Sequence, residues 1–321
     1  MGGATSNFFS QSWPPKPSFT EQSLSSLQGK VFIVTGGASG VGFELVKLLY
    51  QKEGTVYVAG RSEQNGITAI KQVLADVPSS KGKIEFLHLD LSDLAGIQKS
   101  AETFTSKQNR LDVLWNNAGV MIPPKGSKSK QDHELQLATN CLGPLLFTQL
   151  LLPLMQTTAK SAPANSVRVI WTGSLTVDLQ APKGGVVVDE LKAQRNLGQD
   201  VLYAESKCGN VFLASEFAKV SGKDGIVSVD QSLNPGNLKS PLQRHMPAYQ
   251  RFVLNPLLHD PVYGAYTELF AGLSPDVTTE QNGAALIPWG RFHDFSRVRP
   301  DIAQSLKSES EGQDDLVYSD T

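Results

Sequence analysis

Tyr203 and Lys207 are the pair of residues whose types and spacing most directly suit proton transfer. They stand four positions apart in a segment of helical character, so both side chains project from one face of the helix. A nearby ammonium group stabilises a phenolate and lowers the pKa of a tyrosine from its ordinary value of about 10, which lets the phenol act as acid or base. A Tyr and Lys pair at this spacing also arises by chance, so the surrounding sequence must show whether this pair is functional.

Ser174 and Asn140 lie where an α/β fold places polar active-site residues. Ser174 follows a β-rich run over residues 167–173, and Asn140 interrupts a long apolar helical pattern. A buried amide needs a hydrogen-bond partner, so the fold must supply one for Asn140. A helix cap or a satisfied core amide explains either residue alone, but four polar groups around one cofactor site favour catalysis.

A glycine-rich turn follows an apolar run over residues 31–34 and precedes a helical pattern, reading Thr-Gly-Gly-Ala-Ser-Gly-Val-Gly from Thr35 to Gly42. The N–H groups at the start of such a helix and the positive end of its dipole attract a pyrophosphate. Gly36, Gly40 and Gly42 allow a tight turn, close approach of a cofactor and close packing of helix on strand. The alternative is a glycine-rich loop that binds no ligand.

The elements that must position these residues are β-rich runs that alternate with helical patterns. Alternation of this kind predicts right-handed crossovers and a single α/β domain, a Rossmann-type doubly wound parallel sheet of about seven strands flanked by helices. Ligands of such sheets bind at the carboxyl ends of the strands. The expected strands cover residues 31–34, 55–59, 83–89, 112–115, 167–172, 225–231 and 284–287, and the expected helices cover residues 64–74, 94–105, 133–154, 204–220 and 261–271.

The composition limits the classes of partner. The chain of 321 residues is 40% hydrophobic and 19% charged, as expected of a globular domain, and its net charge of −2 argues against nucleic acid as a partner. Cys141 and Cys208 provide no disulfide framework and indicate reduced thiols in an intracellular, cytoplasmic protein. His245 and His259 lack the clustered ligands of a metal site, so no metal is expected.

The two ends of the chain differ in composition from the part between them. Residues 1–28 lack the features of a signal peptide and are interpreted as an N-terminal arm, whereas the acidic residues 301–321 predict a mobile tail. Function is expected within residues 29–300. The longest apolar segment, residues 141–155, is too short to span a bilayer, so it predicts no integral membrane segment. It is interpreted as a buried or oligomer-facing helix, compatible with a homodimer or a higher homo-oligomer.

Several motifs occur in an order that resembles the short-chain dehydrogenase/reductase family over roughly residues 29–295. The segment between Ser174 and Tyr203 resembles the retinol-dehydrogenase-like subgroup, and the proline-bearing lead-in resembles fungal members that act in secondary metabolism. The matching motifs are the turn from Thr35 to Gly42, Asp90-Leu91, Asn116-Asn117-Ala118-Gly119, Asn234-Pro235-Gly236, and a catalytic tetrad of Asn140, Ser174, Tyr203 and Lys207.

The resemblance implies an oxidoreductase that transfers hydride between a nicotinamide cofactor and a carbonyl or alcohol. It implies that Tyr203 is the acid or base, that Lys207 binds the nicotinamide ribose, and that Ser174 bonds the substrate oxygen. It also implies that Asn140 holds a water linking Lys207 to solvent. The cofactor contacts that it carries over are Gly36, Ser39, Gly40, Val41, Gly42, Asp90, Leu91, Asn117, Ala118, Gly119, Tyr203, Lys207, Pro235, Gly236 and Ser240, the last a serine where the family usually has threonine.

The end of the second predicted strand favours NADP(H) over NAD(H). A carboxylate there would bind the ribose 2′-hydroxyl and repel a 2′-phosphate, but this chain reads Ala59-Gly60-Arg61-Ser62. Arg61 can pair with a phosphate through its planar guanidinium, and Ser62 can add a hydroxyl. The alternative is that Arg61 is an exposed surface arginine, and Glu63 just beyond it would weaken the preference.

The resemblance implies a substrate lid around residues 238–261, where the family has its substrate-covering loop, and these residues are rich in apolar side chains. Such a lid suits a small lipophilic ketone, aldehyde or alcohol, although the same side chains could pack on the body or form a subunit contact. Two other functions stay open at this point. One is a catalytically silent NADP(H)-binding sensor or scaffold, because folds of this type are reused without chemistry, and the lesser one is a C=C reductase.

Overall fold

The structure is a computed structural model that describes residues 11–187, 197–231, 258–294, 296 and 299–312. Its centre is a sheet of six parallel strands in the order β3-β2-β1-β4-β5-β6, which confirms the expected Rossmann-type, single-domain α/β fold. The strand order reverses between β1 and β4, and ligands of such sheets bind at this switch point. The strands are β1 (Val31–Thr35), β2 (Thr55–Gly60), β3 (Lys83–His88), β4 (Val113–Asn116), β5 (Arg168–Thr172) and β6 (Val227–Gln231).

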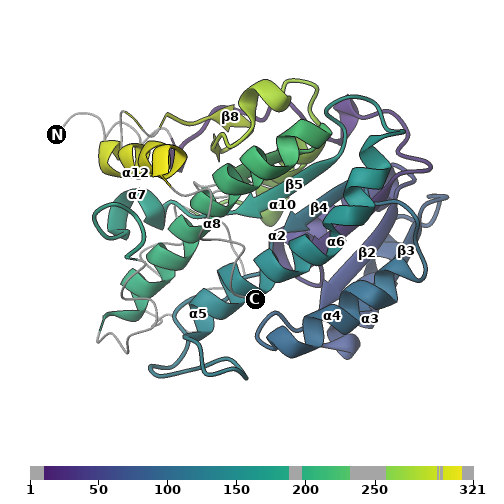
Figure 1. Cartoon of the computed structure of the whole chain (residues 1–321). Helices are drawn as coiled ribbons and strands as arrows, with labels where there is room; N and C mark the ends of the chain where they lie inside the picture. The colour runs from purple at the N-terminus through teal and green to yellow at the C-terminus, as the bar shows by residue number, and fades with distance from the viewer. Residues whose placement is uncertain (1–10, 188–196, 232–257, 295, 297–298, 313–321) are drawn as a thin grey trace.

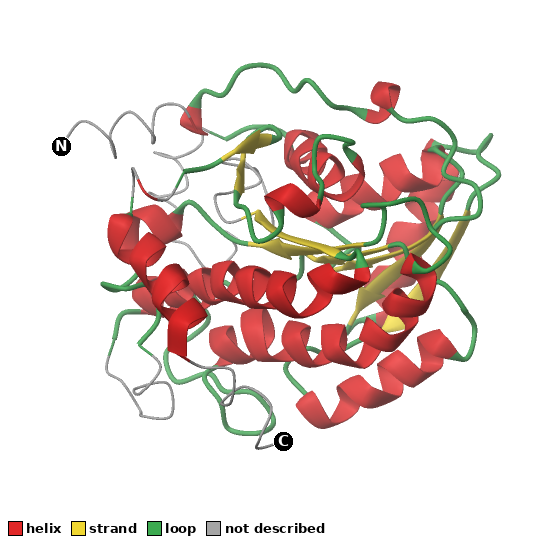
Figure 2. Ribbon diagram, turned by 45° about the horizontal axis from the view of Figure 1, so that its top comes forward, coloured by secondary structure: helices red, strands yellow, loops and turns green. Residues whose placement is uncertain are grey.

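Two layers of helices cover the sheet (Figure 1, Figure 2). Because both faces are covered, every residue of β1, β4 and β5 is buried and the strands show no polar alternation. One layer contains α2 (Gly40–Gln51), α3 (Glu63–Asp76) and α10 (Pro261–Leu273), and the other contains α4 (Leu94–Thr105), α6 (Gly143–Ala159) and α8 (Gln199–Ser221).

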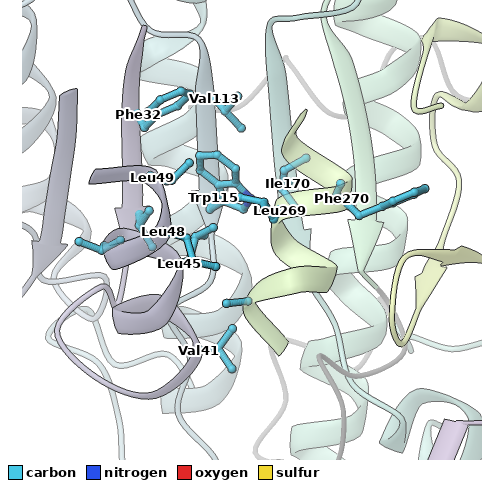
Figure 3. Close-up of a cluster of buried hydrophobic side chains, with 14 of the residues drawn as sticks. Phe32, Val41, Leu45, Leu48, Leu49, Val113, Trp115, Ile170, Leu269 and Phe270 are labelled. Atoms are coloured by element: carbon cyan, nitrogen blue, oxygen red, sulfur yellow. The ribbon is translucent and has the colours of Figure 1, made fainter. Parts of the chain in front are cut away.

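Trp115 of β4 lies at the centre of the cluster of buried side chains between the sheet, α2 and α10 (Figure 3). Its indole Nε1 donates a hydrogen bond of 2.9 Å to the main-chain oxygen of Glu268. A Cβ on Gly272 would lie 2.1 Å from the indole ring, so only glycine lets α10 approach this closely. The strand and the helix are therefore held in one fixed arrangement.

A buried arginine terminates α10. Nη1 and Nη2 of Arg168 donate to the main-chain oxygens of Ala271 and Ser274, both at 2.8 Å. The last carbonyl groups of a helix lack intrahelical partners, and the guanidinium supplies them here. Burial lowers the pKa of Arg168 to about 10, which leaves the side chain charged at neutral pH.

The expected seventh strand does not join the described part of the sheet. Residues 284–287 contribute only β7 (Leu286–Ile287), which pairs antiparallel with β8 (Arg291–Phe292). Where this segment meets the edge of β6, Gly283 N donates to Ser228 O at 2.8 Å and Ser228 N donates to the side chain of Asn282 at 2.6 Å. These bonds occupy the edge of β6, where a seventh strand would have paired. Among the described residues the sheet therefore has six strands, not the expected number of about seven.

The helix expected over residues 133–154 is divided into three parts. A short turn, α5 (Leu135–Leu137), leads into a π-helical turn, η2 (Ala138–Leu142), and then into α6. Asn140 lies in the π-helical turn, a geometry that is rare in proteins and often found at functional sites. Apolar periodicity alone did not distinguish this turn from a continuous helix.

The stretch Leu135–Ala159 is long and apolar enough to cross a membrane, but half of its most apolar window is buried inside the protein. Phe147, Leu151 and Met155 are fully buried in the cluster between the sheet and α4. A core helix of a sheet protein has this composition, and we interpret α6 as one.

The N-terminal arm packs along the domain over its described residues. The ring of Phe19 meets Phe270 of α10 edge to face at 6.0 Å between ring centres, and Leu27 is buried. Nζ of Lys52 donates to Leu24 O at 2.8 Å. The arm therefore covers the outer side of the α2 and α10 layer.

The C-terminal segment differs from the expected mobile tail. Residues from 300 onward form α12 (Pro300–Gly312), and Ile302 is fully buried in a cluster with α8. Arg299 donates to the main-chain oxygens of Val177 and Pro182, at 2.7 and 2.8 Å, and so ties α12 to α7 (Thr176–Gln180) and the loop that follows (Figure 1). Residues 313–321 lie outside the described residues.

Candidate active site

The candidate site lies at the carboxyl ends of β1, β4 and β5, where the strand order reverses. The turn after β1, the loop after β4 and Ser174 after β5 meet the amino-terminal half of α8 here. Parallel strands present their carboxyl ends along one edge, so segments far apart in the sequence converge. The fold brings Asn140, Ser174, Tyr203 and Lys207 to this edge.

The glycine-rich turn has the geometry of a phosphate cradle. Gly36 and Gly40 adopt φ values of +68° and +58°, which favour glycine. A Cβ on Gly42 would lie 2.6 Å from Asn117 Nδ2 and 2.7 Å from Gly36 O. Ser39, the residue before α2, makes no side-chain capping bond, so the first N–H groups of α2 remain available to an anion. The residues present therefore fit a pyrophosphate.

Thr35 joins this turn to the loop after β4. Its hydroxyl donates to Trp115 O at 3.1 Å and accepts from Ala118 N at 2.9 Å. Asn117 Nδ2 donates to Thr35 O at 2.7 Å. This network holds the two loops on either side of the switch point together, and it places Asn117, Ala118 and Gly119 beside the glycine-rich turn.

Tyr203 is buried, and the Ser174 hydroxyl lies close enough to the phenol to affect its pKa. Burial raises the pKa of Tyr203 to about 12, and the influence of Ser174 offsets part of that rise. The expectation that the Tyr203 pKa is lowered is therefore not met, because the pKa is raised. Nζ of Lys207 lies 5.9 Å from the centre of the tyrosine ring, and desolvation of the phenolate is the largest influence on this pKa.

Lys207 points to the end of β5. Its Nζ donates to Thr172 O at 2.6 Å. A Cβ on Gly119 would lie 3.3 Å from Nζ of Lys207 and 3.2 Å from Oδ1 of Asn140, so both atoms flank the same glycine. A larger residue at position 119 would push the lysine away from Asn140.

Asn140 has the partners that the sequence required of it. Its Oδ1 accepts from Val120 N at 2.8 Å, and its Nδ2 donates to Val120 O at 3.0 Å and to Ser206 Oγ at 2.9 Å. The amide therefore locks the loop after β4 onto α8.

The residues proposed for the adenosine side of the cofactor lie at the ends of β2 and β3. Arg61 directly follows β2 and is exposed. The hydroxyl of Ser62 accepts from Asn65 N at 3.3 Å and begins α3, which leaves its O–H free to donate. Asp90 accepts from the main chain and the hydroxyl of Ser92 at 3.0 and 2.6 Å. Leu91 is buried.

Three predicted cofactor contacts, Pro235, Gly236 and Ser240, lie outside the described residues, as does most of the expected lid at residues 238–261. Their placement stays a prediction.

The structure places near the candidate site further polar residues that the sequence did not single out. Ser206 donates to Tyr203 O at 2.8 Å, and Asn210 Nδ2 donates to Thr172 O at 2.9 Å. These two follow Tyr203 at helical spacing, which was the signal that could have found them. Glu268 is the only charged residue in α10 and is fully buried against Thr172. The feature of the sequence that could have identified Glu268 is a single charged residue in an otherwise apolar helical segment.

Wild-type stability is expected to fall relative to Glu268→Gln as the pH rises from about 4.5 to about 8. Burial raises the pKa of Glu268 from 4.5 to about 8, so over this interval the folded state holds a proton that the unfolded state has lost. Raising the pH then favours unfolding, by up to about 5 kcal/mol at the alkaline end. Urea unfolding of both proteins at about pH 5, 7 and 9 measures the difference. Parallel stability curves would contradict the assignment.

Comparisons with known proteins give a consistent result. A profile with the description short chain dehydrogenase matches residues 30–186. The short-chain dehydrogenase/reductase iacJ of Pestalotiopsis fici is 46% identical over 309 residues, 94% of this chain and 92% of the relative. A short-chain dehydrogenase/reductase of Phomopsis amygdali is 45% identical over 311 residues, 95% of this chain and 91% of the relative.

Solved structures share the fold. The NADPH-bound carbonyl reductase from chicken fatty liver matches with a TM-score of 0.61 at 21% identity, over 84% of this chain and 98% of that chain. At this identity the likeness concerns the fold alone.

Proposed function

The chain belongs to the short-chain dehydrogenase/reductase family, and from this premise we propose that it is an NADP(H)-dependent oxidoreductase that interconverts a lipophilic ketone or aldehyde and the corresponding alcohol. The observation that carries the proposal is the convergence of three side chains at the switch point: the Ser174 hydroxyl acts on the buried Tyr203 phenol, and Nζ of Lys207 lies 5.9 Å from the centre of the tyrosine ring. The members of the tetrad come from three separate segments of the chain, because Tyr203 and Lys207 share α8. Their convergence beside a phosphate cradle favours a catalytic role for these residues over a purely structural one.

Tyr203 is the proposed proton donor in reduction. When bound, NADPH supplies the hydride that the carbonyl carbon accepts. Ser174 donates a hydrogen bond to the carbonyl oxygen, and Tyr203 gives that oxygen its proton as negative charge develops. A pKa of about 12 keeps Tyr203 protonated at neutral pH, the form that reduction requires.

Lys207 and Asn140 support this proton transfer. In the proposed role, the Lys207 ammonium hydrogen-bonds the nicotinamide ribose and stabilises the phenolate that Tyr203 becomes after donation. Asn140 fixes the loop that lines the lysine and, as the resemblance implies, holds a water that links Lys207 to solvent. The phenolate then regains its proton by this route.

The substrate class rests on the apolar sequence of the lid. Residues 238–261 include Met246, Tyr249, Phe252 and Leu254, which suit a lipophilic molecule. The fungal origin of the relatives supports a place in secondary metabolism. We also propose an intracellular location, supported by buried Cys141 and Cys208, which form no disulfide, and a homodimer or higher homo-oligomer stays a prediction.

The direct test is turnover by the purified protein. NADPH consumption is measured against a panel of lipophilic ketones and aldehydes, and each product is identified by mass spectrometry. Alcohol products support the proposal, whereas saturated carbonyl products from enones indicate a C=C reductase. NADPH binding without turnover on any substrate favours the silent sensor or scaffold.

Arg61→Ala is expected to raise the KM for NADPH by about 10- to 100-fold and to leave the KM for NADH unchanged. The reason is the loss of a charge-assisted bond to the 2′-phosphate, which NADH lacks. Steady-state kinetics with both cofactors measure the effect, and Lys71→Ala, which removes an exposed cation of α3, is the matched control. Wild-type protein that uses NADH as well as NADPH would refute the NADP(H) assignment.

A further inference from the structure

Glu268 is a fully buried acid that the proposed chemistry does not use. It lies on α10, in the opposite helical layer from the α8 residues Tyr203 and Lys207. We propose that Glu268 and Thr172 are positioning residues for Lys207: the carboxyl group of Glu268 anchors the side chain of Thr172, and the main-chain oxygen of Thr172 holds Nζ of Lys207.

Thr172 links the two helical layers, because its side chain contacts α10 and its main-chain oxygen contacts α8. Thr172 Oγ1 donates to Glu268 Oε1 at 3.0 Å on the α10 side. Thr172 O accepts from Nζ of Lys207 at 2.6 Å and from Nδ2 of Asn210 at 2.9 Å on the α8 side. Thr172 is the last residue of β5, where the ladder ends and the strand no longer fixes the peptide by itself. A side-chain anchor at this position therefore controls the direction of the carbonyl group.

The anchor is itself rigid. The main-chain oxygen of Glu268 accepts the indole N–H of Trp115 at 2.9 Å, and Arg168 holds the end of α10. The carboxyl group thus projects from a helix that is fixed to β4 at Glu268 itself and to β5 at its carboxyl end. Rigid supports of this kind keep reactive side chains within a fraction of an ångström of their working position.

Burial of this acid argues for a specific role. Oε2 of Glu268 has no hydrogen-bond partner among the described residues, and a buried polar atom without a partner costs stability. A leucine would fill the same space without that cost. Because burial favours the neutral acid at neutral pH, the useful property of Glu268 is its ability to accept a hydrogen bond from Thr172 rather than its charge.

Four variants distinguish a positioning role of Glu268 and Thr172 from a purely structural role. Glu268→Gln keeps an acceptor for Thr172, and Thr172→Ser keeps the hydroxyl, so both should stay within about threefold of wild-type kcat and NADPH Kd. Glu268→Leu and Thr172→Val break the anchor and should lower kcat by about 10- to 100-fold and raise the Kd for NADPH by about tenfold. The kinetic readout rests on the proposed function, but the NADPH Kd, measured by fluorescence, does not need turnover.

The double variant Glu268→Leu/Thr172→Val removes both polar groups and restores an apolar contact. It should recover a melting temperature near that of wild type while its kcat and its NADPH Kd stay impaired, because the carbonyl group of Thr172 remains unanchored. Thr267→Val is the control, since Thr267 is a fully buried neighbour on α10 whose hydroxyl has no partner among the described residues. It should leave kcat and Kd unchanged.

Each outcome decides the proposal. Recovery of wild-type kcat and Kd in the double variant would make the pair merely structural and overturn it. Loss of function in Glu268→Gln equal to that in Glu268→Leu would assign the effect to charge and overturn it as stated. If wild type shows no turnover on the substrate panel, the proposed function fails, and the NADPH Kd series still decides the positioning role.

Discussion

Tyr203→Phe is expected to lower kcat by about 10²- to 10⁴-fold and to leave the Kd for NADPH within about threefold of wild type. The substitution removes one hydroxyl from a side chain that is only 6% exposed and keeps the ring in its packing. It removes the hydroxyl that is the proposed proton donor, so protonation of the substrate oxygen should slow. Single-turnover measurement of NADPH oxidation on the best substrate, with the Kd from fluorescence titration, separates chemistry from binding.

Tyr57→Phe is the matched control for this loss. Tyr57 is also buried, at 1% exposure, and its hydroxyl accepts from Nε2 of Gln108 at 2.9 Å. It lies on β2 and makes no contact with the tetrad, so its variant should cost some stability and no turnover. Unchanged turnover in Tyr203→Phe would remove the proton-donor role, and an equal loss in both variants would assign the effect to folding.

Gly42→Ala is expected to weaken NADPH binding by about 10- to 100-fold, the second large effect. Its Cβ would lie 2.6 Å from Asn117 Nδ2 and 2.7 Å from Gly36 O, and the second of these atoms is backbone that cannot rotate away. The turn must shift, at a cost of about 1–3 kcal/mol, and the N–H groups that face the pyrophosphate shift with it. Isothermal titration with NADPH measures the change.

Gly96→Ala controls for the general effect of adding a methyl group. Gly96 lies in α4, where a Cβ would meet only the side chain of Asp93, with 3.1 Å to the nearest oxygen. Alanine in a helix is favoured over glycine, so this variant should bind NADPH normally and melt no lower than wild type. NADPH affinity in Gly42→Ala equal to that in Gly96→Ala would contradict the phosphate-cradle assignment.

The sequence predicted the features that depend on short-range pattern. The apolar runs identified β1 to β6, and the helical spacing placed Tyr203 and Lys207 on one face of α8. Alternation of strand and helix then implied the parallel sheet, and hence the edge at which the tetrad gathers. These inferences succeed because each rests on a single element or on a general rule of connection.

Features that depend on contacts between distant segments were not predictable in the same way. The anchor of Thr172 by Glu268 joins residues 96 positions apart, and neither residue belongs to a motif. The pKa of Tyr203 depends on how deeply the phenol is buried, which the spacing of Lys207 does not reveal. The pairing of β7 with β8 depended on how the edge of β6 is used, which only the folded chain specifies.

The attachment of α12 to α7 also sets an order of events during synthesis. Arg299 bonds Val177 O, and Asp301 accepts from Gly184 N at 2.9 Å, across 122 and 117 residues respectively. A ribosome delivers residues 176–184 long before these two partners, so the segment that follows Ser174 emerges without the contacts that hold it. The nascent protein can therefore assemble its sheet and glycine-rich turn early, but the contacts that hold the segment after Ser174 form only when α12 has been synthesised.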